Sequence, residues 1–220
     1  MKYKVIGFCV LGGSIIVILA ALFFYLNKRV KDIQGYNSFL NEKRNGCIST
    51  KEITGVNVTI KYQPPLYMTL KEAEQLKANE IRPSWDSIYK KQACMTTFLM
   101  TIGPDKLKGK DKRHSIMYEG VNDYAEYTQR VLSTNFNMVQ QIRLYVNGEE
   151  RIPVLSLLEN VYELSEDRSF VIVFVNDGMR SMKGNDYLFV YDDPFFNMGK
   201  VQFHFKGDDL EDANNVIVKR

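Results

Sequence analysis

Histidine and cysteine are scarce in this sequence, with 2 histidines and 3 cysteines among 220 residues. Three cysteines are too few for a disulfide framework, so the fold has to rest on a hydrophobic core. Neither His114 nor His204 has a partner at metal-ligand spacing, and no His-Glu-x-x-His, Cys-x-x-Cys or Gly-x-Ser-x-Gly motif occurs. The sequence therefore predicts no metal, no cofactor and no catalytic centre.

Proline and glycine are also limited, at 6 and 14 residues, which excludes collagen-like and low-complexity chains. Hydrophobic residues make up 45% of the sequence and charged residues 25%, which is typical of globular proteins. A length of 220 residues suits one sizeable domain with an anchor and leaves little room for two domains with linkers.

The domain has little excess of either charge. Five basic residues and one acidic residue lie within residues 1–34, which leaves 24 basic and 25 acidic residues for the rest of the chain. Nucleic-acid binding requires a clear cationic surplus, so we expect no nucleic-acid partner. Residues 106–113 are locally basic, and we interpret them as a solvated loop, with binding of phosphate or acidic lipid as the alternative.

What the sequence does contain is one long uncharged segment, residues 5–26. As an α-helix it would be about 33 Å long, enough to cross a hydrocarbon core of about 30 Å. Tyr3 and Tyr25 fall at the depth of the two headgroup regions. We therefore expect an uncleaved signal anchor in membrane lipid, preceded by a basic stub at residues 1–4.

A cleaved signal peptide is the main alternative to this anchor. The apolar segment is longer than the usual ~7–15 residues, and no small-x-small cleavage site follows it, so we favour the anchor. A short basic N-terminus favours export of the domain. The expected organisation is a stub at 1–4, a transmembrane anchor at 5–26, a juxtamembrane stalk at 27–50 and an extracytoplasmic domain at 51–220.

Alternating polar and apolar residues, or short apolar runs, predict most of the strands. The predicted strands are 55–62, 93–102, 142–146, 169–175, 187–191 and 201–206. Asn147-Gly148 predicts a hairpin in which residues 151–154 return beside 142–146. Val216–Val218, behind an acidic stretch at 208–212, either pair with a sheet edge or stay loose.

Capping signals and helical spacing predict the helices. Thr69–Glu72 and Ser156–Glu159 each have the capping-box form, which predicts helices from 69 to about 79 and from 156 to 164. We expect residues 83–89 to form a short helix. Asp123 caps a long amphipathic helix that runs to Val139 with its apolar face buried. Together these elements predict an α+β fold with a mixed, mostly antiparallel sheet packed by three or four helices.

Two further features suggest candidate sites. Cys47 and Cys94 are the pair that could form a disulfide in an exported domain, and two small buried thiols are the alternative. Tyr191, Phe195 and Phe196 lie in or beside an apparent turn. Aromatic residues there either pack against the core from its rim or contact a partner.

We expect a single-pass membrane-anchored, non-enzymatic domain that binds protein partners, for example as a subunit of a cell-envelope or secretion assembly. One alternative is a membrane-tethered ligand-binding or sensing domain, which requires an enclosed apolar cavity with a few convergent polar groups. Another is an anchored hydrolase that uses Asp186, Asp192 and Asp193. That alternative requires the three carboxylates to meet within one cleft.

Overall fold

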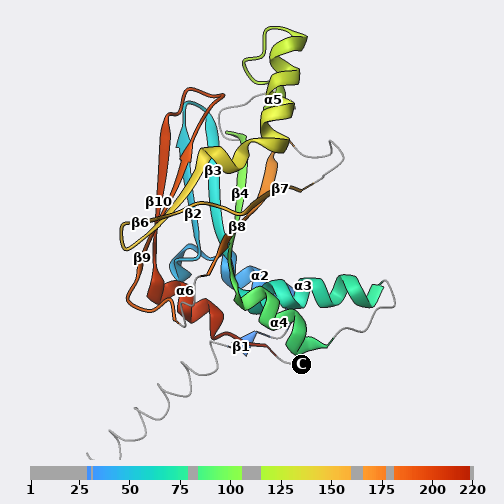
Figure 1. Ribbon diagram of the computed structural model, residues 1–220, viewed down its shortest axis with the longest axis vertical. Coiled ribbons are helices and arrows are strands. Elements are labelled where there is room, and N and C mark those ends of the chain that lie inside the picture. The colour runs from blue at the N-terminus through green and yellow to red at the C-terminus, as the bar shows by residue number, and fades with distance from the viewer. Residues whose placement is uncertain are drawn as a thin grey trace, which may run out of the picture.

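A computed structural model of the chain describes residues 29–30, 32–78, 84–105, 115–159, 166–176 and 181–218 (Figure 1). The predicted stub and anchor lie outside these residues, as does the basic stretch at 106–113. Across the described ranges, no helix combines the length and the apolar character that crossing a membrane requires.

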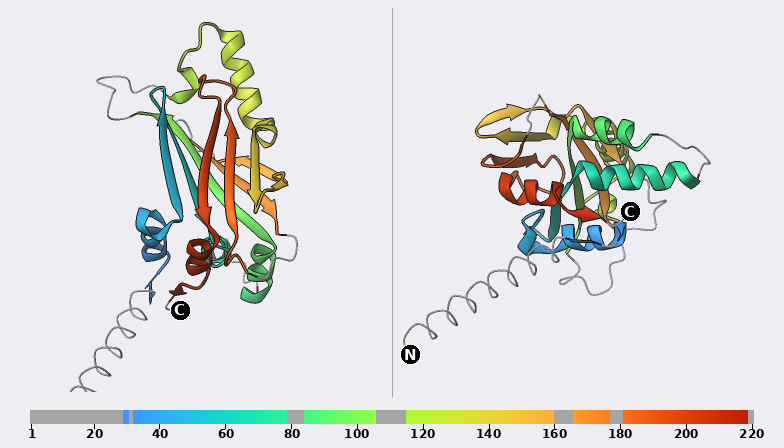
Figure 2. Two further views of the ribbon diagram at one scale, coloured as in Figure 1. Left: turned by 90° about the vertical axis from the view of Figure 1, so that its left-hand side faces the viewer. Right: turned by 90° about the horizontal axis from the view of Figure 1, so that it is seen from below.

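Two antiparallel sheets form the centre of the domain (Figure 2). One sheet has the strand order β2-β3-β4-β8-β7, with bounds Ile48–Ile53, Val56–Gln63, Met95–Pro104, Arg168–Val175 and Leu155–Leu158. The other has the order β10-β9-β5-β6, with bounds Lys200–Lys206, Asp186–Asp192, Ile142–Val146 and Glu149–Arg151. Every strand pair within these two sheets is antiparallel.

The hydrophobic core lies between the facing sides of the two sheets. Successive residues of a strand point to opposite faces, and the buried residues of β3 follow this period of two. Phe98 of β4 reaches across to the other sheet, with ring centroids 5.4 Å from Phe189 and 5.5 Å from Phe205. Edge-to-face and tilted aromatic pairs of this kind join the two sheets into one core.

The helices lie at the two ends of the sheets and not between them (Figure 1). Helices α2, α3, α4 and α6 gather at one end, with bounds Ile33–Asn41, Pro65–Ala78, Trp85–Ala93 and Gly207–Asn214. Helix α5, Tyr124–Phe136, lies at the opposite end. Three short 3-10 helices complete the described elements, η1 (Lys43–Asn45), η2 (Ile116–Tyr118) and η3 (Met138–Gln141).

A short parallel ladder joins the two ends of the described chain. Strand β1, Arg29–Val30, pairs with β11, Ile217–Val218. Both lie at the end of the domain that carries α2 and α6 (Figure 1). The predicted anchor ends at residue 26, so it joins the domain at this end. Residues 217–218 therefore neither stay loose nor pair with the edge of one of the larger sheets, but pair with β1 in a two-stranded ladder of their own.

The predicted fold class is confirmed as α+β with antiparallel sheets, and two of its details were wrong. The strands form two facing sheets instead of one, and the chain crosses between them three times, from β4 to β5, from β6 to β7 and from β8 to β9. The described residues also contain five α-helices instead of three or four. The acidic stretch belongs to α6, where Asp208 and Asp209 occupy the first turn and interact favourably with the helix dipole.

The expected boundary between stalk and domain at residue 51 lies too late in the chain. Tyr36 and Leu40 of α2 are fully buried, and the Tyr36 hydroxyl donates to the Ala213 carbonyl at 2.6 Å. Strand β2 already begins at Ile48. A stalk does not bury its aromatic side chains in a core, so α2, η1 and the start of β2 belong to the domain.

Both predicted capping boxes were wrong. Helix α3 begins at Pro65, and the Thr69 hydroxyl lies inside it, donating to the Pro65 carbonyl at 2.7 Å. Leu155–Leu158 form strand β7, which pairs with β8 where a helix was expected. The edge of β8 offers this apolar segment a ladder of backbone hydrogen bonds, and that tertiary pairing overrides the local capping pattern.

Other local predictions are confirmed. Strands β3, β4, β5, β8, β9 and β10 and helix α4 lie within a few residues of their predicted positions. Asn147 and Gly148 have positive φ values of 51° and 84°, the conformation that a two-residue hairpin requires. Asp123 caps α5 by accepting from the Glu126 N–H at 2.8 Å.

Candidate functional site

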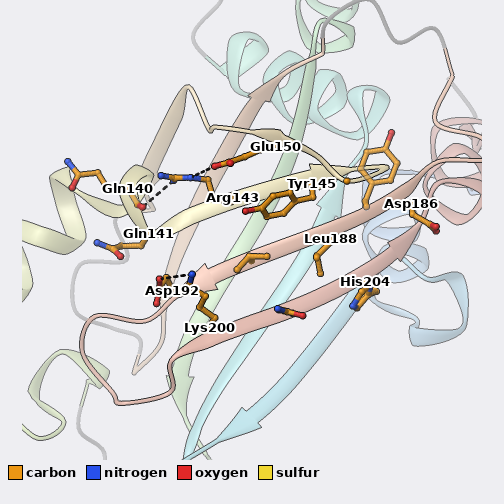
Figure 3. Close-up of a pocket in the computed structure, with 14 residues that line it drawn as sticks. Gln140, Gln141, Arg143, Tyr145, Glu150, Asp186, Leu188, Asp192, Lys200 and His204 are labelled. Atoms are coloured by element: carbon orange, nitrogen blue, oxygen red, sulfur yellow. Dashed lines mark hydrogen bonds and ion pairs between the residues drawn. The ribbon is translucent and has the colours of Figure 1, made fainter.

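The outer face of the four-stranded sheet forms an open groove of about 770 Å³ (Figure 3). Its walls come from β5, β6, β9, β10, the turn between β5 and β6, and η3. The lining residues are Gln140, Gln141, Arg143, Tyr145, Gly148, Glu150, Asp186, Tyr187, Leu188, Val190, Asp192, Lys200, Gln202 and His204.

Strand β9 divides its side chains between the core and this groove. Phe189 and Tyr191 point inward and are fully buried. Leu188 and Val190 point outward and line the groove. The period of two that builds the core therefore also places an apolar stripe along the floor of the groove.

The strand register sets polar side chains on both sides of this stripe. Leu188 lies opposite Tyr145 of β5 on one side and opposite His204 of β10 on the other. Val190 likewise lies between Arg143 and Gln202. Each row across the sheet thus has an apolar centre flanked by groups that donate or accept hydrogen bonds.

Four of the five charged Arg, Lys, Asp and Glu side chains that line the groove form two ion pairs near its edges, and Asp186 is the fifth (Figure 3). Arg143 Nε lies 2.8 Å from Glu150 Oε1, and Lys200 Nζ lies 3.9 Å from Asp192 Oδ2. The Arg143 guanidinium also donates to the Ile142 carbonyl at 2.7 Å. With these charges paired, the groove presents no strong field of one sign to a ligand.

The carboxylates proposed for a hydrolase do not meet in this groove. Asp186 and Asp192 are the two terminal residues of β9, which puts them about 20 Å apart at ~3.3 Å per residue. The Asp193 carboxylate accepts from the backbone N–H groups of Phe196 at 2.7 Å and Met198 at 3.0 Å. The structure thus contradicts the requirement of that alternative. Within the described ranges, no three metal-ligating side chains cluster either.

The three residues predicted as a partner contact lie against the rest of the domain. Tyr191 is fully buried. Phe195 and Phe196 are half-buried, and the Arg130 guanidinium carbon of α5 lies 5.5 and 5.0 Å from their ring centroids. These contacts agree with the other interpretation of the aromatic residues, in which they pack against the core from its rim.

Arg130 is the centre of this packing. Its guanidinium donates to the backbone carbonyls of Ile116 at 3.3 Å, Met117 at 3.4 Å and Glu119. Burial lowers the pKa of Arg130, and the nearby Asp193 carboxylate acts in the opposite direction. The space beside it is about 10 Å³, room for one water at most. This cluster fastens α5 to the Phe195–Phe196 turn and holds no ligand cavity.

Cys47 and Cys94 are free thiols, so the disulfide considered in the sequence analysis is not formed. Cys47 comes directly before β2 and Cys94 directly before β4, with β3 lying between these two strands. Two strand spacings amount to about 9.5 Å, beyond the ~6.8 Å limit for Cα atoms of a disulfide. Cys47 is buried and Cys94 is exposed, so the alternative of two buried thiols holds for Cys47 alone.

Burial sets the chemistry of the Cys47 thiol. Together with the Asp209 and Asp212 carboxylates, it raises the pKa of Cys47 to about 12. The thiol donates weakly to the Asn45 carbonyl at 3.3 Å. Cys47 is therefore a neutral packing residue and a poor nucleophile.

No sequence pattern predicted the groove itself. The alternation of β10 identified the solvent-facing side of that strand, including His204. No local signal indicated that β5 and β9 would lie beside it, because strand order depends on contacts between distant residues. The outward Leu188 and Val190 looked like part of a strand covered on both faces.

Comparison with known proteins adds little to this description. No known protein family matches the chain, and no curated protein matches its sequence. One similar solved structure is a 1.90 Å crystal structure of a "novel protein of unknown function" from Burkholderia pseudomallei. It has a TM-score of 0.38 and 9% identity over 86% of this chain and 96% of that one. A likeness this weak supports no inference about fold or function.

Proposed function

We propose that the chain is a single-pass membrane-anchored, non-enzymatic domain that binds a protein partner in the groove of the four-stranded sheet. The observation that carries this proposal is the pair of apolar residues on the groove side of β9, the partly exposed Leu188 and the 8% exposed Val190, flanked by Tyr145, Gln202 and His204. An apolar centre with a hydrogen-bonding rim is the usual anatomy of a protein interface.

The shape of the groove favours a polypeptide over a small molecule. Small-molecule sites enclose about 70–90% of their ligand's surface, whereas this groove is an open sheet face. It follows β9 over 7 residues, about 20 Å, the length of an extended segment of six or seven residues. A partner segment can place alternate side chains on the apolar stripe and the others toward Gln202 and His204.

The ion pairs of the groove also restrict the charge of the segment that it can bind. The paired Arg143–Glu150 and Lys200–Asp192 leave no free cationic surface for phosphates. A segment of low net charge fits best. With the predicted anchor joined at β1, such a partner would be another component of the same membrane, as in an envelope or secretion assembly.

A photo-crosslinking probe tests this proposal in intact cells. A probe at Gln202, on the groove side of β10, is expected to give a discrete protein adduct. A matched probe at Thr50 on the other sheet is not, since that residue is exposed far from the groove. The change Leu188→Glu is expected to abolish the Gln202 adduct, and Thr50→Glu to leave it intact. An adduct that persists in Leu188→Glu, or none at all, contradicts the proposal.

A ligand-binding or sensing domain is the second candidate. One observation favours it: the groove volume of about 770 Å³ lies within the ~300–1,000 Å³ range of small-molecule sites, and Tyr145 and Tyr187 line it. This candidate predicts that small molecules raise the melting temperature of the chain and that Leu188→Glu removes the effect, with no protein adduct at Gln202.

A further inference from the structure

Helix α5 turns part of its apolar surface away from the domain. Its buried residues are Arg130 and Thr134. Leu132 is 52% exposed and Phe136 is 76% exposed. An amphipathic helix normally buries its apolar stripe, and the predicted burial of this stripe was wrong for these two residues. Leu132 and Phe136, one helical turn apart, therefore form an exposed apolar spot on α5 beside the polar Gln129 and Asn135.

The neighbouring chain continues this apolar surface. Helix α5 contacts β7, which is an edge strand of the five-stranded sheet. Leu155 and Leu157 point outward from β7, and Ile152 and Val154 precede it. All four are about half exposed or more. We define the α5–β7 surface as Leu132, Phe136, Ile152, Val154, Leu155 and Leu157. It contains no charged side chain.

The size of the surface is close to that of a stable interface. Six large apolar side chains at this exposure present on the order of 600 Å². The largest apolar patch on a soluble monomer is typically about 300–600 Å² and is often functional, and a standard interface buries about 800 Å² on each partner. A modest polar rim around these six residues brings the area to that value.

We propose that the α5–β7 surface binds a second copy of this chain and makes the protein a homodimer. In a two-fold dimer the same patch meets itself, so like charges would oppose each other. The absence of charge among its six residues meets this condition. With a polar rim the surface reaches what a standard interface buries. It does not include the groove, so the inference is independent of the proposed partner site.

The position of the surface excludes lipid as its cover. Strand β1, where the predicted anchor joins, lies at the opposite end of the domain from α5 (Figure 1). Two copies anchored in one membrane would hold their α5–β7 surfaces at the same height above the bilayer. Confinement to one plane raises their local concentration and so favours the pairing.

The test measures the mass of the full chain in detergent micelles by light scattering at micromolar concentrations. The unaltered chain is expected to be dimeric. Phe136→Glu and Leu157→Glu are each expected to weaken association at least tenfold, since each would place a charge against its own symmetry mate. The control Tyr89→Glu, at a 40% exposed site on α4, is expected to leave the dimer intact. A dimer held by the anchors alone would be insensitive to all three changes.

Cysteine chemistry in the native membrane gives a second readout. In a Cys94→Ser background, which removes the exposed thiol, Phe136→Cys is expected to form a disulfide-linked dimer on mild oxidation and Tyr89→Cys is not. If the chain is monomeric and the thiol at position 136 does not react with a soluble maleimide, other segments of the same chain cover the surface. A monomer whose thiol reacts freely leaves the surface to another protein or to solvent. Either monomer, or a dimer that survives Phe136→Glu, overturns the proposal.

Discussion

Replacing Arg130 with leucine would test whether a buried cation holds α5 in place. The Arg130 side chain is 7% exposed. Its guanidinium donates to three carbonyls and stacks on Phe195 and Phe196. Leucine keeps the apolar stem but supplies no donor, so the Met117 and Glu119 carbonyls would lose their partner while the surrounding chain still shields them from water. The Ile116 carbonyl would keep the Glu119 N–H as a donor, at 3.3 Å.

The expected cost follows from these contacts. Carbonyls left without a donor cost about 1–3 kcal/mol each when buried, and a desolvated cation–π contact contributes about 2 kcal/mol. Leucine also removes the cost of burying the charged guanidinium, which offsets part of this loss. We expect Arg130→Leu to lower the free energy of unfolding by about 3–4 kcal/mol, and therefore the melting temperature by roughly 10 °C for a domain of this size.

Arg143 supplies a matched control, because its guanidinium also donates to three carbonyls, those of Val139, Gln140 and Ile142. Its side chain is 32% exposed, so water replaces the lost donor and Arg143→Leu should cost about 1 kcal/mol or less. Urea unfolding of both variants, followed by near-ultraviolet circular dichroism, measures the difference. Equal losses in the two variants, or a loss below about 1 kcal/mol for Arg130→Leu, would refute the reasoning.

Three further predictions concern the packing around the groove and the helical end. Asp193→Ala removes the acceptor of backbone N–H groups in the Phe195–Phe196 turn and should cost about 2–3 kcal/mol in urea unfolding, with Asp193→Asn intermediate. Burial raises the pKa of Cys47 from 9.0 to about 12, so this thiol contributes fully to the free energy of unfolding below pH 9 and progressively less as the pH rises toward 12. Cys47→Ala should make the stability decline less over that pH range. A soluble maleimide at pH 8 should label Cys94 but not Cys47 in the folded domain. Gly207→Ala would set a Cβ 1.9 Å from the Met182 carbonyl oxygen and should lower the melting temperature by several degrees, whereas an unchanged value would mean that the backbone there moves freely.

Features set by neighbouring residues could be predicted from the sequence. The alternation of Val56, Val58 and Ile60 identified β3 because a strand with one buried face carries its own period. Asn147-Gly148 identified the β5–β6 hairpin because few other residue pairs adopt two positive φ values.

Features set by distant contacts could not. The Ser156–Glu159 pattern indicated a helix, but only the edge of β8, supplied by residues that follow in the chain, turns Leu155–Leu158 into a strand. The same holds for the groove, which exists because β9 lies between β5 and β10. No residue near Leu188 indicates that its outward face stays only partly covered by the described elements.

The buried face of α5 shows a subtler limit. Helical spacing correctly placed Leu132 and Phe136 on one side of the helix, and burial of that side was the natural expectation. Arg130 reverses the orientation, because its long stem and fork of donors satisfy carbonyls of η2 and neighbouring residues that no apolar side chain could satisfy. A single polar residue with enough partners can outweigh an apolar stripe.

The β1–β11 ladder affects how far the domain can move from the membrane. The proposed tether would pull on Arg29, at the N-terminal end of β1, while α6 holds Ile217, at the N-terminal end of β11. A force applied at the same end of two parallel strands breaks the hydrogen bonds of this two-residue ladder one after another. Its release would free residues 29–30 as extended chain, about 7 Å at ~3.4 Å per residue, while the buried Tyr36 and Leu40 keep α2 in place. The domain could thus extend its stand-off from the bilayer under tension without unfolding its core.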